Sequence, residues 1–131
     1  FLIEVCLVIK GLGIDIIEIG RIKKAIENEN FLARVFTVKE IAYCEAKKAQ
    51  KAPSYAARFA GKEAVLKAFG TGLREGKLRE IEIINDELGC PQVFLTGFFA
   101  ELAKRKNITS IYITLSHTKE NAIAQVVFGG E

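Results

Sequence analysis

The stretch Arg58-Phe-Ala-Gly-Lys62-Glu63-Ala-Val-Leu-Lys67-Ala-Phe-Gly70 has the pattern of a long amphipathic helix, around which the rest of the chain can be organised. Pro53 and Ser54 precede it, and Ser54 is a candidate N-cap. Gly70 supplies a stop signal. The apolar side chains recur at helical spacing and are Tyr55, Phe59, Leu66 and Phe69. The stretch therefore predicts a helix that opens after Pro53-Ser54 and ends at Gly70.

Glu63 and Lys67 lie one turn apart on this helix, so their side chains are neighbours. Such a pair is commonly an exposed ion pair that contributes little to stability. It can also be half of a polar site beside the apolar arc. The stretch alone leaves both interpretations open, and the choice depends on the rest of the chain.

Composition and charge are those of an ordinary globular chain. Of 131 residues, 50% are hydrophobic and 27% are charged, which argues against disorder. We expect residues 1–131 to form one domain. The front half is mildly basic, because residues 1–67 carry 12 Lys and Arg against 8 Asp and Glu. This surplus fits an anionic ligand or partner but is too small to indicate nucleic acid.

The ends and the cysteines indicate a cytoplasmic protein that does not enter a membrane. The apolar residues 1–9 are interrupted by Glu4 and are too short to span a bilayer. They lack the basic start and small-residue cleavage site of a signal peptide. Cys6, Cys44 and Cys90, with only one His in the chain, do not have the spacing of a zinc site. Reduced thiols are the simplest interpretation.

Residues 8–19 (VIKGLGIDIIEI) are rich in β-branched side chains and predict a buried strand that carries one carboxylate, Asp15. An unpaired buried carboxylate is costly, so Asp15 needs a cation, a metal ion or several N–H donors. Helix capping is the simpler alternative, although the residues after Asp15 continue the strand pattern.

A basic helix is predicted at residues 20–30, with Ile22 and Ile26 facing inward. Its first turns carry Arg21, Lys23 and Lys24. Cations at a helix N-terminus oppose the helix dipole, so an acidic partner would compensate for their placement. A solvated basic face is the alternative.

The remaining segments complete an α+β pattern. Thr37 and Glu40 have the spacing of a capping box and predict a helix through about Ala49. Four further strands and one helix follow the central helix, at 78–85, 92–95, 110–116 and 122–128 for the strands and from Thr96 or Gly97 to 106 for the helix. The order strand, three helices, two strands, helix, two strands indicates an α+β fold with a mainly antiparallel sheet packed against helices.

Asp15, the Glu63/Lys67 helix and His117 together suggest phosphate chemistry. Two carboxylates from separate elements can share Mg²⁺, which completes its coordination with water and phosphate oxygens. Lysines and a His nearby would stabilise charge on a transferring phosphate. The segment Gly70-Thr71-Gly72 either presents backbone N–H groups to phosphate or is only a helix stop. A single His at the end of a strand, such as His117, is by itself more often a packed or solvent-exposed residue than a functional one.

Two motifs resemble the bacterial holo-acyl-carrier-protein synthases, the short 4′-phosphopantetheinyl transferases. They are Gly13-Ile-Asp15-Ile-Ile-Glu-Ile19 and the stretch from Arg58 to Gly72. The resemblance continues in family order through nearly the whole chain after Val8, at Phe36-Thr37 with Glu40, Ile81-Glu82-Ile83, Gly89 with Pro91, and Leu115-Ser116-His117-Thr118. The family usually has Ala where this chain has Gly61, a change that removes no polar group.

The resemblance implies a Mg²⁺-dependent transfer of 4′-phosphopantetheine from coenzyme A to a serine of apo acyl carrier protein, in lipid biosynthesis, with release of adenosine 3′,5′-bisphosphate. Asp15 and Glu63 are then the metal ligands, and Lys67 contacts the phosphate. These three are the expected catalytic residues. The expected contacts to coenzyme A are Arg58, Lys62, Gly70, Gly72 and His117.

Partners follow from the same resemblance. Acyl carrier proteins are strongly acidic, so a basic docking surface is expected, formed by Arg21, Lys23, Lys24 and Arg34. Short members of the family form homotrimers with sites at subunit interfaces. In such a trimer we expect Asp15 and His117 of one subunit to face the Glu63 helix of its neighbour.

Two other classes remain open on the residues. A different Mg²⁺-dependent phosphoryl or pyrophosphate enzyme, acting on a free nucleotide, would keep Asp15, Glu63 and Lys67 but would not need the basic helix. A binding module for an acidic helix or nucleic acid would need the basic helix but not the two carboxylates.

Overall fold

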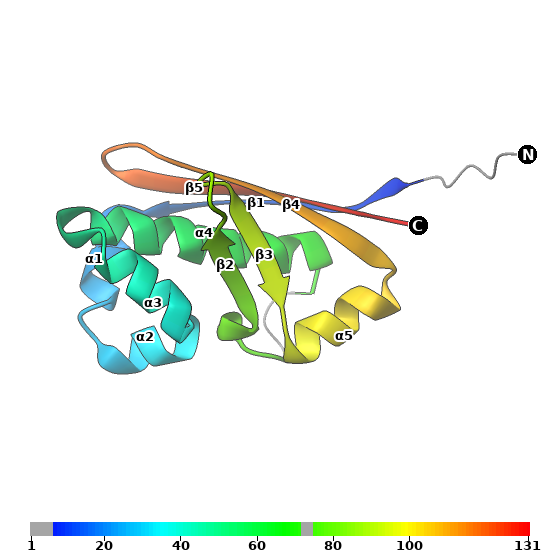
Figure 1. The fold of residues 1–131 in the computed structure, drawn as a ribbon, viewed down its shortest axis with the longest axis horizontal. Coiled ribbons are helices and arrows are strands. Elements are labelled where there is room, and N and C mark those ends of the chain that lie inside the picture. Colours follow the sequence, from blue (N-terminus) through cyan, green and yellow to red (C-terminus); the bar gives the residue numbers. More distant parts are fainter. Residues whose placement is uncertain (1–6, 72–74) are drawn as a thin grey trace, which may run out of the picture.

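The computed structural model describes residues 7–71 and 75–131. Its centre is the long helix α4 (Lys51–Phe69), which lies along one face of a three-stranded sheet (Figure 1). That sheet has the order β1 (Val8–Glu18), β5 (Asn121–Gly130) and β4 (Ile108–His117), and both pairs are antiparallel. The predicted α+β fold with a mainly antiparallel sheet is therefore confirmed.

Two smaller groups of elements flank α4. One holds the short helices α1 (Ile19–Ala25), α2 (Glu29–Val35) and α3 (Val38–Glu45), with a 3₁₀ turn at Lys48–Gln50. The other holds a 3₁₀ turn at Leu78–Glu80, the hairpin of β2 (Ile81–Asn85) and β3 (Pro91–Leu95), and helix α5 (Gly97–Arg105).

The single helix predicted for 20–30 is wrong, because the structure divides this region into α1 and α2. Asn28 causes the division: its side-chain oxygen accepts hydrogen bonds from the backbone N–H groups of Asn30 and Phe31, at 2.8 and 3.3 Å. Asn is a favoured N-cap residue, so a new helix begins there. Ile22 and Ile26 face inward as predicted.

Helix α4 begins at Lys51, earlier than predicted, and Ser54 is not its N-cap. Pro53 is compatible with this earlier start because N–H groups in the first turn have no intrahelical partner. The Ser54 hydroxyl instead donates to Cys44 Sγ at 3.3 Å. The predicted stop is confirmed, because Gly70 has a left-handed backbone conformation with φ of 79°.

Other predicted boundaries shift by a few residues. The Thr37–Glu40 capping box is present, but α3 ends at Glu45 rather than near Ala49. The strand predicted for 78–85 begins only at Ile81, after the 3₁₀ turn.

Strand β1 packs very closely on α4 because it carries glycines where the two backbones meet. A Cβ atom on Gly13 would lie 1.8 Å from the carbonyl oxygen of Ala64, and one on Gly11 would lie 2.3 Å from that of Ala68. Such distances exclude a side chain. This contact places Asp15, two residues after Gly13 and on the same side of the strand, against α4.

The opposite face of β1 is not buried, which corrects the prediction of a buried strand. Leu12, Ile14 and Ile16 are 62%, 55% and 62% exposed, and Tyr112 on β4 is 62% exposed. They form an apolar outer sheet face, whereas the inner face packs on α4 through Ala124, Val126 and Phe128.

In the described residues, no helix is both long and apolar enough to cross a membrane.

Candidate functional site

The predicted catalytic residues meet where α4 faces β1, with Glu63 and Lys67 on α4 and Asp15 on β1. Lys67 Nζ donates to Asp15 Oδ1 at 3.1 Å and to the carbonyl oxygen of Ile14 at 2.9 Å. The Lys67 side chain is 56% exposed and that of Asp15 is 16% exposed, so the pair lies at the edge of the interior. Asp15 thus has the cation that its partial burial requires.

Glu63 is half-buried beside this pair. Partial burial raises the pKa of Glu63, the nearby charge of Asp15 raises it further, and Lys67 opposes the change. The effect of Asp15 on Glu63 means that the two carboxylates of one chain are close enough for their charges to repel each other. This contradicts the expected arrangement in which Asp15 faces the Glu63 helix of a neighbouring subunit.

The two carboxylates fit a hard divalent cation. No group of three or more His, Cys, Asp or Glu side chains gathers in the parts of the chain that the structure describes, so a metal here would have two protein carboxylates at most. Mg²⁺ is bound in this way, since it keeps several waters or phosphate oxygens. A cation between Asp15 and Glu63 would also relieve their repulsion.

Lys62 does not belong to this site, which corrects its prediction as a coenzyme contact. Its side chain is fully buried, and Nζ donates to Glu40 Oε1 at 2.8 Å and to the carbonyl oxygens of Leu78 and Ile81. Burial lowers the pKa of Lys62, and Glu40 opposes this. All three hydrogen bonds of the ammonium are therefore used inside the fold, and none is directed to a ligand.

A second cluster, on another side of α4, contains Arg58 and His117. Both line a cavity of about 350 Å³ between the end of α3, the start of α4, the β2–β3 turn and the end of β4. Arg58 lies five residues before Glu63, which places it about 140° around the helix axis. Arg58 and His117 of one chain thus line the same cavity, which is separate from the Asp15–Glu63 pair.

The predicted glycine contacts are only partly visible. Gly70 is exposed directly after α4, one turn beyond Lys67. Gly72 lies outside the described residues. The backbone conformation of Gly70 is that of a helix stop.

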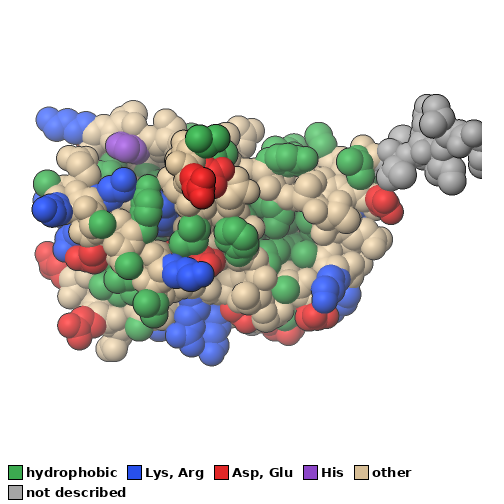
Figure 2. All heavy atoms as spheres, in the orientation of Figure 1, with side chains coloured by type: hydrophobic (Ala, Val, Ile, Leu, Met, Phe, Trp, Pro, Cys, Tyr) green, Lys and Arg blue, Asp and Glu red, His purple; other side chains and the backbone are tan. Residues whose placement is uncertain are grey.

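The four predicted partner-binding cations are all exposed. Arg21, Lys23 and Lys24 lie on α1, and Arg34 lies on α2. Basic side chains lie over the α1–α3 end of the molecule, with acidic side chains between them (Figure 2).

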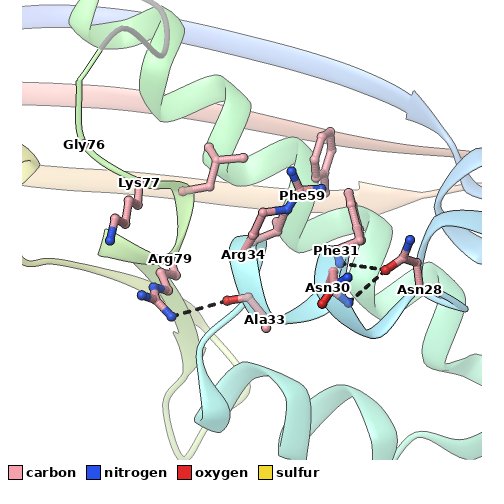
Figure 3. A pocket seen from close by; sticks show the side chains of 11 residues that line it. Asn28, Asn30, Phe31, Ala33, Arg34, Phe59, Gly76, Lys77 and Arg79 are labelled. Carbon is pink, nitrogen blue, oxygen red and sulfur yellow. Dashed lines mark hydrogen bonds between the residues drawn. The ribbon is translucent and has the colours of Figure 1, made fainter.

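Arg34 also lines an open cavity of about 970 Å³ between α2, α4 and the 3₁₀ turn before β2 (Figure 3). Phe31 and Phe59 form apolar parts of its wall, and their ring centroids are 6.1 Å apart. Lys77 and Arg79 also line it, and Arg79 Nη1 donates to the carbonyl oxygen of Ala33 at 3.5 Å. The cavity thus combines an aromatic wall with basic side chains.

Sequence reasoning missed the residues that surround Arg58. Tyr43 and Asn85 both contact it, yet they lie 15 and 27 residues away along the chain. No local pattern marks such contacts. The one local signal of a cation site was Tyr43, an aromatic residue that shortly precedes Lys47 and Lys48.

A family model described as the 4′-phosphopantetheinyl transferase superfamily matches residues 11–126. A protein of Clostridium tetani named holo-[acyl-carrier-protein] synthase is 51% identical over 124 residues, which cover 94% of this chain and 98% of that protein. A protein of Ruminiclostridium cellulolyticum with the same name is 51% identical over 119 residues, covering 88% of this chain and 89% of that protein.

Solved structures give the same picture. The holo-[acyl-carrier-protein] synthase of Helicobacter pylori, solved in complex with coenzyme A, matches with a TM-score of 0.78 and 34% identity, over 89% of this chain and 98% of that chain. The enzyme of the same name from Neisseria meningitidis matches with a TM-score of 0.83 and 30% identity, over 92% of this chain and 98% of that chain.

Proposed function

The chain belongs to the holo-[acyl-carrier-protein] synthases of the 4′-phosphopantetheinyl transferase superfamily, and we propose that it transfers 4′-phosphopantetheine from coenzyme A to a serine of apo acyl carrier protein. The observation that carries this proposal is the Asp15–Glu63–Lys67 cluster, which consists of two partly buried carboxylates and an exposed ammonium. The reaction serves lipid biosynthesis, in which carrier proteins hold growing acyl chains.

Asp15 and Glu63 of one chain would hold Mg²⁺, which when bound supplies positive charge to the pyrophosphate of coenzyme A. Lys67 lies next to both carboxylates and is 56% exposed, so its ammonium can also reach a phosphate oxygen. Its charge would stabilise the leaving phosphate. The carrier protein's serine oxygen would form the new bond to the phosphorus that carries the pantetheine arm, while the bond from this phosphorus to the bridging oxygen of the pyrophosphate breaks. The serine proton would pass to a carboxylate or to water, and adenosine 3′,5′-bisphosphate leaves with the bridging oxygen.

Coenzyme A has a third phosphate, on its ribose, and we assign this group to the cavity of Arg58 and His117. Two donors there come from different elements, α4 and β4, and both line the same cavity. Arginine is well suited to phosphate because its planar guanidinium donates from several N–H groups. Gly70 and Gly72 would contact the coenzyme through backbone N–H groups beyond the end of α4.

A homotrimer would bring the two clusters to one coenzyme. Within a chain, α4 separates Arg58 from Glu63, since they point about 140° apart. A site at a subunit interface would combine Asp15, Glu63 and Lys67 of one subunit with Arg58 and His117 of its neighbour. The exposed Leu12, Ile14, Ile16 and Tyr112 give such an assembly an apolar face to bury.

The docking surface for the carrier protein would be the basic α1–α2 region. Arg21, Lys23, Lys24 and Arg34 offer positive charge to an acidic partner. The neighbouring cavity with Phe31 and Phe59 could take apolar side chains from an amphipathic helix of that partner. The reaction is placed in the cytoplasm, in keeping with the free thiols of Cys44 and Cys90.

Intact-mass measurement tests the proposal directly. The protein is incubated with coenzyme A, Mg²⁺ and an apo acyl carrier protein, and the carrier protein is weighed. We expect a mass gain of one phosphopantetheine group that disappears with a chelator. An unchanged carrier-protein mass in the presence of Mg²⁺ would contradict the proposal.

A charge-reversal variant separates this function from hydrolysis of a free nucleotide. Replacing Arg21, Lys23 and Lys24 by Glu should abolish carrier-protein modification while leaving the Asp15–Glu63 cluster in place. The matched control replaces Lys104, Arg105 and Lys106 by Glu. These three residues lie in the second half of the chain, away from α1 and α2, so their reversal should have little effect.

A further inference from the structure

Arg58 is held in one position by contacts from three segments. Its Nη2 donates to Asn85 Oδ1 at 2.9 Å, and its Nη1 donates to Ser54 Oγ at 3.3 Å. Its guanidinium carbon lies 4.1 Å from the centroid of the Tyr43 ring, within cation–π range. The side chain is 3% exposed. This arginine is therefore fixed before any ligand binds.

Asn85 and Tyr43 are linked to each other as well as to Arg58. The Asn85 amide nitrogen donates to the Tyr43 hydroxyl at 3.0 Å and to the carbonyl oxygen of Gly89 at 3.2 Å. Asn85 therefore uses its oxygen for Arg58 and its nitrogen for α3 and the β2–β3 turn. The three side chains form one connected unit across α3, α4 and β2.

Among the described residues, no ion pair joins this unit to a carboxylate. The residues that line the cavity include Lys47, Arg58 and His117 but no Asp or Glu, and Lys47 Nζ lies 4.8 Å from the Tyr43 ring centroid. Arg58 Nε has no hydrogen-bond partner within residues 7–71 and 75–131. A buried cation without a countercharge is costly, so its presence points to an anion as the missing partner.

We propose that Tyr43 and Asn85 are positioning residues, which hold the Arg58 guanidinium ready for the ribose phosphate of coenzyme A. This inference rests on the proposed function. Tyr43 supports one face of the guanidinium, and Asn85 occupies Nη2, so that rotation of the side chain is restricted. A fixed arginine loses less conformational freedom when the phosphate binds.

The test is a double-mutant cycle between Asn85→Ala and Arg58→Ala. The measured quantity is kcat/KM for coenzyme A divided by kcat/KM for dephospho-coenzyme A, which lacks the ribose phosphate. Asn85→Ala should lower this ratio about tenfold, as expected for the loss of about 1.4 kcal/mol. In the Arg58→Ala background, the same substitution should change the ratio less than about twofold, because Asn85 acts only through Arg58.

Two Tyr43 variants separate the ring from the hydroxyl. Tyr43→Phe keeps the ring beneath Arg58 and should lower the ratio only about twofold, whereas Tyr43→Leu removes it and should approach the effect of Asn85→Ala. Gln92→Ala is the matched control, because it removes an exposed amide from the same hairpin outside the Arg58 cavity. It should leave the ratio unchanged.

Three results would overturn the inference. Asn85→Ala could lower kcat/KM equally for both substrates, which would indicate general damage to the fold, or its effect could be equal with and without Arg58. In either case the parent's activity shows that the proposed function survives. If the parent protein does not transfer phosphopantetheine from coenzyme A, the proposed function fails and this inference fails with it.

Discussion

Two lysines on the same helix have opposite surroundings. Lys62 is fully buried with Glu40 in a contact between α4, α3 and β2, whereas Lys67 pairs with Asp15 on β1 and is 56% exposed. They are five residues apart, so they point about 140° apart around α4. Lys62 stabilises the packing of the helix, and Lys67 is available to a ligand.

The difference shows how one motif can contain both a charged side chain that stabilises the fold and one that is available to a ligand. The carboxylates near the two lysines differ in the same way. Glu40 accepts hydrogen bonds from Lys62 Nζ and from the backbone N–H groups of Thr37 and Ile83. The pKa of Glu63, in contrast, is raised first by its partial burial and then by the nearby charge of a second carboxylate, Asp15. A satisfied carboxylate is structural, and a repelled one marks a place for a cation.

The largest effect on activity is expected at the two carboxylates that are proposed to hold Mg²⁺ and that contribute little to the stability of the fold. Asp15→Asn and Glu63→Gln should each lower the rate of carrier-protein modification by about two to three orders of magnitude, because each removes charge that would hold Mg²⁺. The free energy of unfolding should change by less than about 1 kcal/mol, because Asn and Gln keep the size and a hydrogen-bond acceptor of the two partly buried side chains. Intact-mass rates and urea denaturation measure the two quantities.

The reverse pattern is expected on the buried side. Lys62→Met leaves the Glu40 charge without its partner and should lower the free energy of unfolding by about 3–5 kcal/mol. Urea denaturation measures the loss. Glu101→Gln, which breaks the exposed Lys104–Glu101 pair on α5, is the control and should cost less than about 1 kcal/mol. A loss for Lys62→Met as small as for this control would mean that the Lys62–Glu40 contact is not structural.

A smaller effect is expected for the packing that brings the two carboxylates together. Gly13→Ala places a methyl group against the Ala64 carbonyl and should push β1 from α4, at a cost of about 1–3 kcal/mol in the free energy of unfolding. The Mg²⁺ concentration needed for half-maximal activity should rise, because Asp15 moves with β1. Gly20→Ala is the control, since a Cβ there meets no neighbouring atom. An unchanged Mg²⁺ requirement in Gly13→Ala would separate the strand contact from the site.

The smallest effect concerns pH. Because the folded-state pKa of Glu63 is raised, its contribution favours folding at pH values below its ordinary pKa and is lost as the pH rises through the raised value. The free energy of unfolding, measured with a chelator, should therefore fall less steeply over this range in Glu63→Gln than in the parent. Added Mg²⁺ should make the pH dependence of the parent as shallow as that of Glu63→Gln, because the ion stabilises the ionised Asp15 and Glu63 in the folded parent. Identical pH profiles for the parent and the variant would contradict the raised pKa.

Much of this site could be predicted from the sequence, but not which of its charged side chains are buried. Asp15 in a strand and Glu63 in a helix could be predicted as partners, and the capping box of Thr37 and the stop at Gly70 follow from local chemistry. The role of Lys62 could not be predicted, because burial depends on β2 and α3, which lie far from it in the chain.

Two other features were hidden for physical reasons. The apolar residues on both sides of β1 resemble those of a buried strand, although one face is exposed in a single chain. The Arg58 contacts with Tyr43 and Asn85 join three separate elements, so no periodicity reveals them. The break at Asn28, in contrast, had a local signal in the N-cap preference of asparagine.

The most direct test of the central claim compares Lys62→Met with Lys67→Met in one experiment. Carrier-protein modification is followed by intact mass at a temperature at which circular dichroism shows both variants to be folded. We predict that Lys67→Met loses activity and keeps the stability of the parent, whereas folded Lys62→Met remains active. A folded Lys62→Met that is as inactive as Lys67→Met, or a fully active Lys67→Met, would contradict the account.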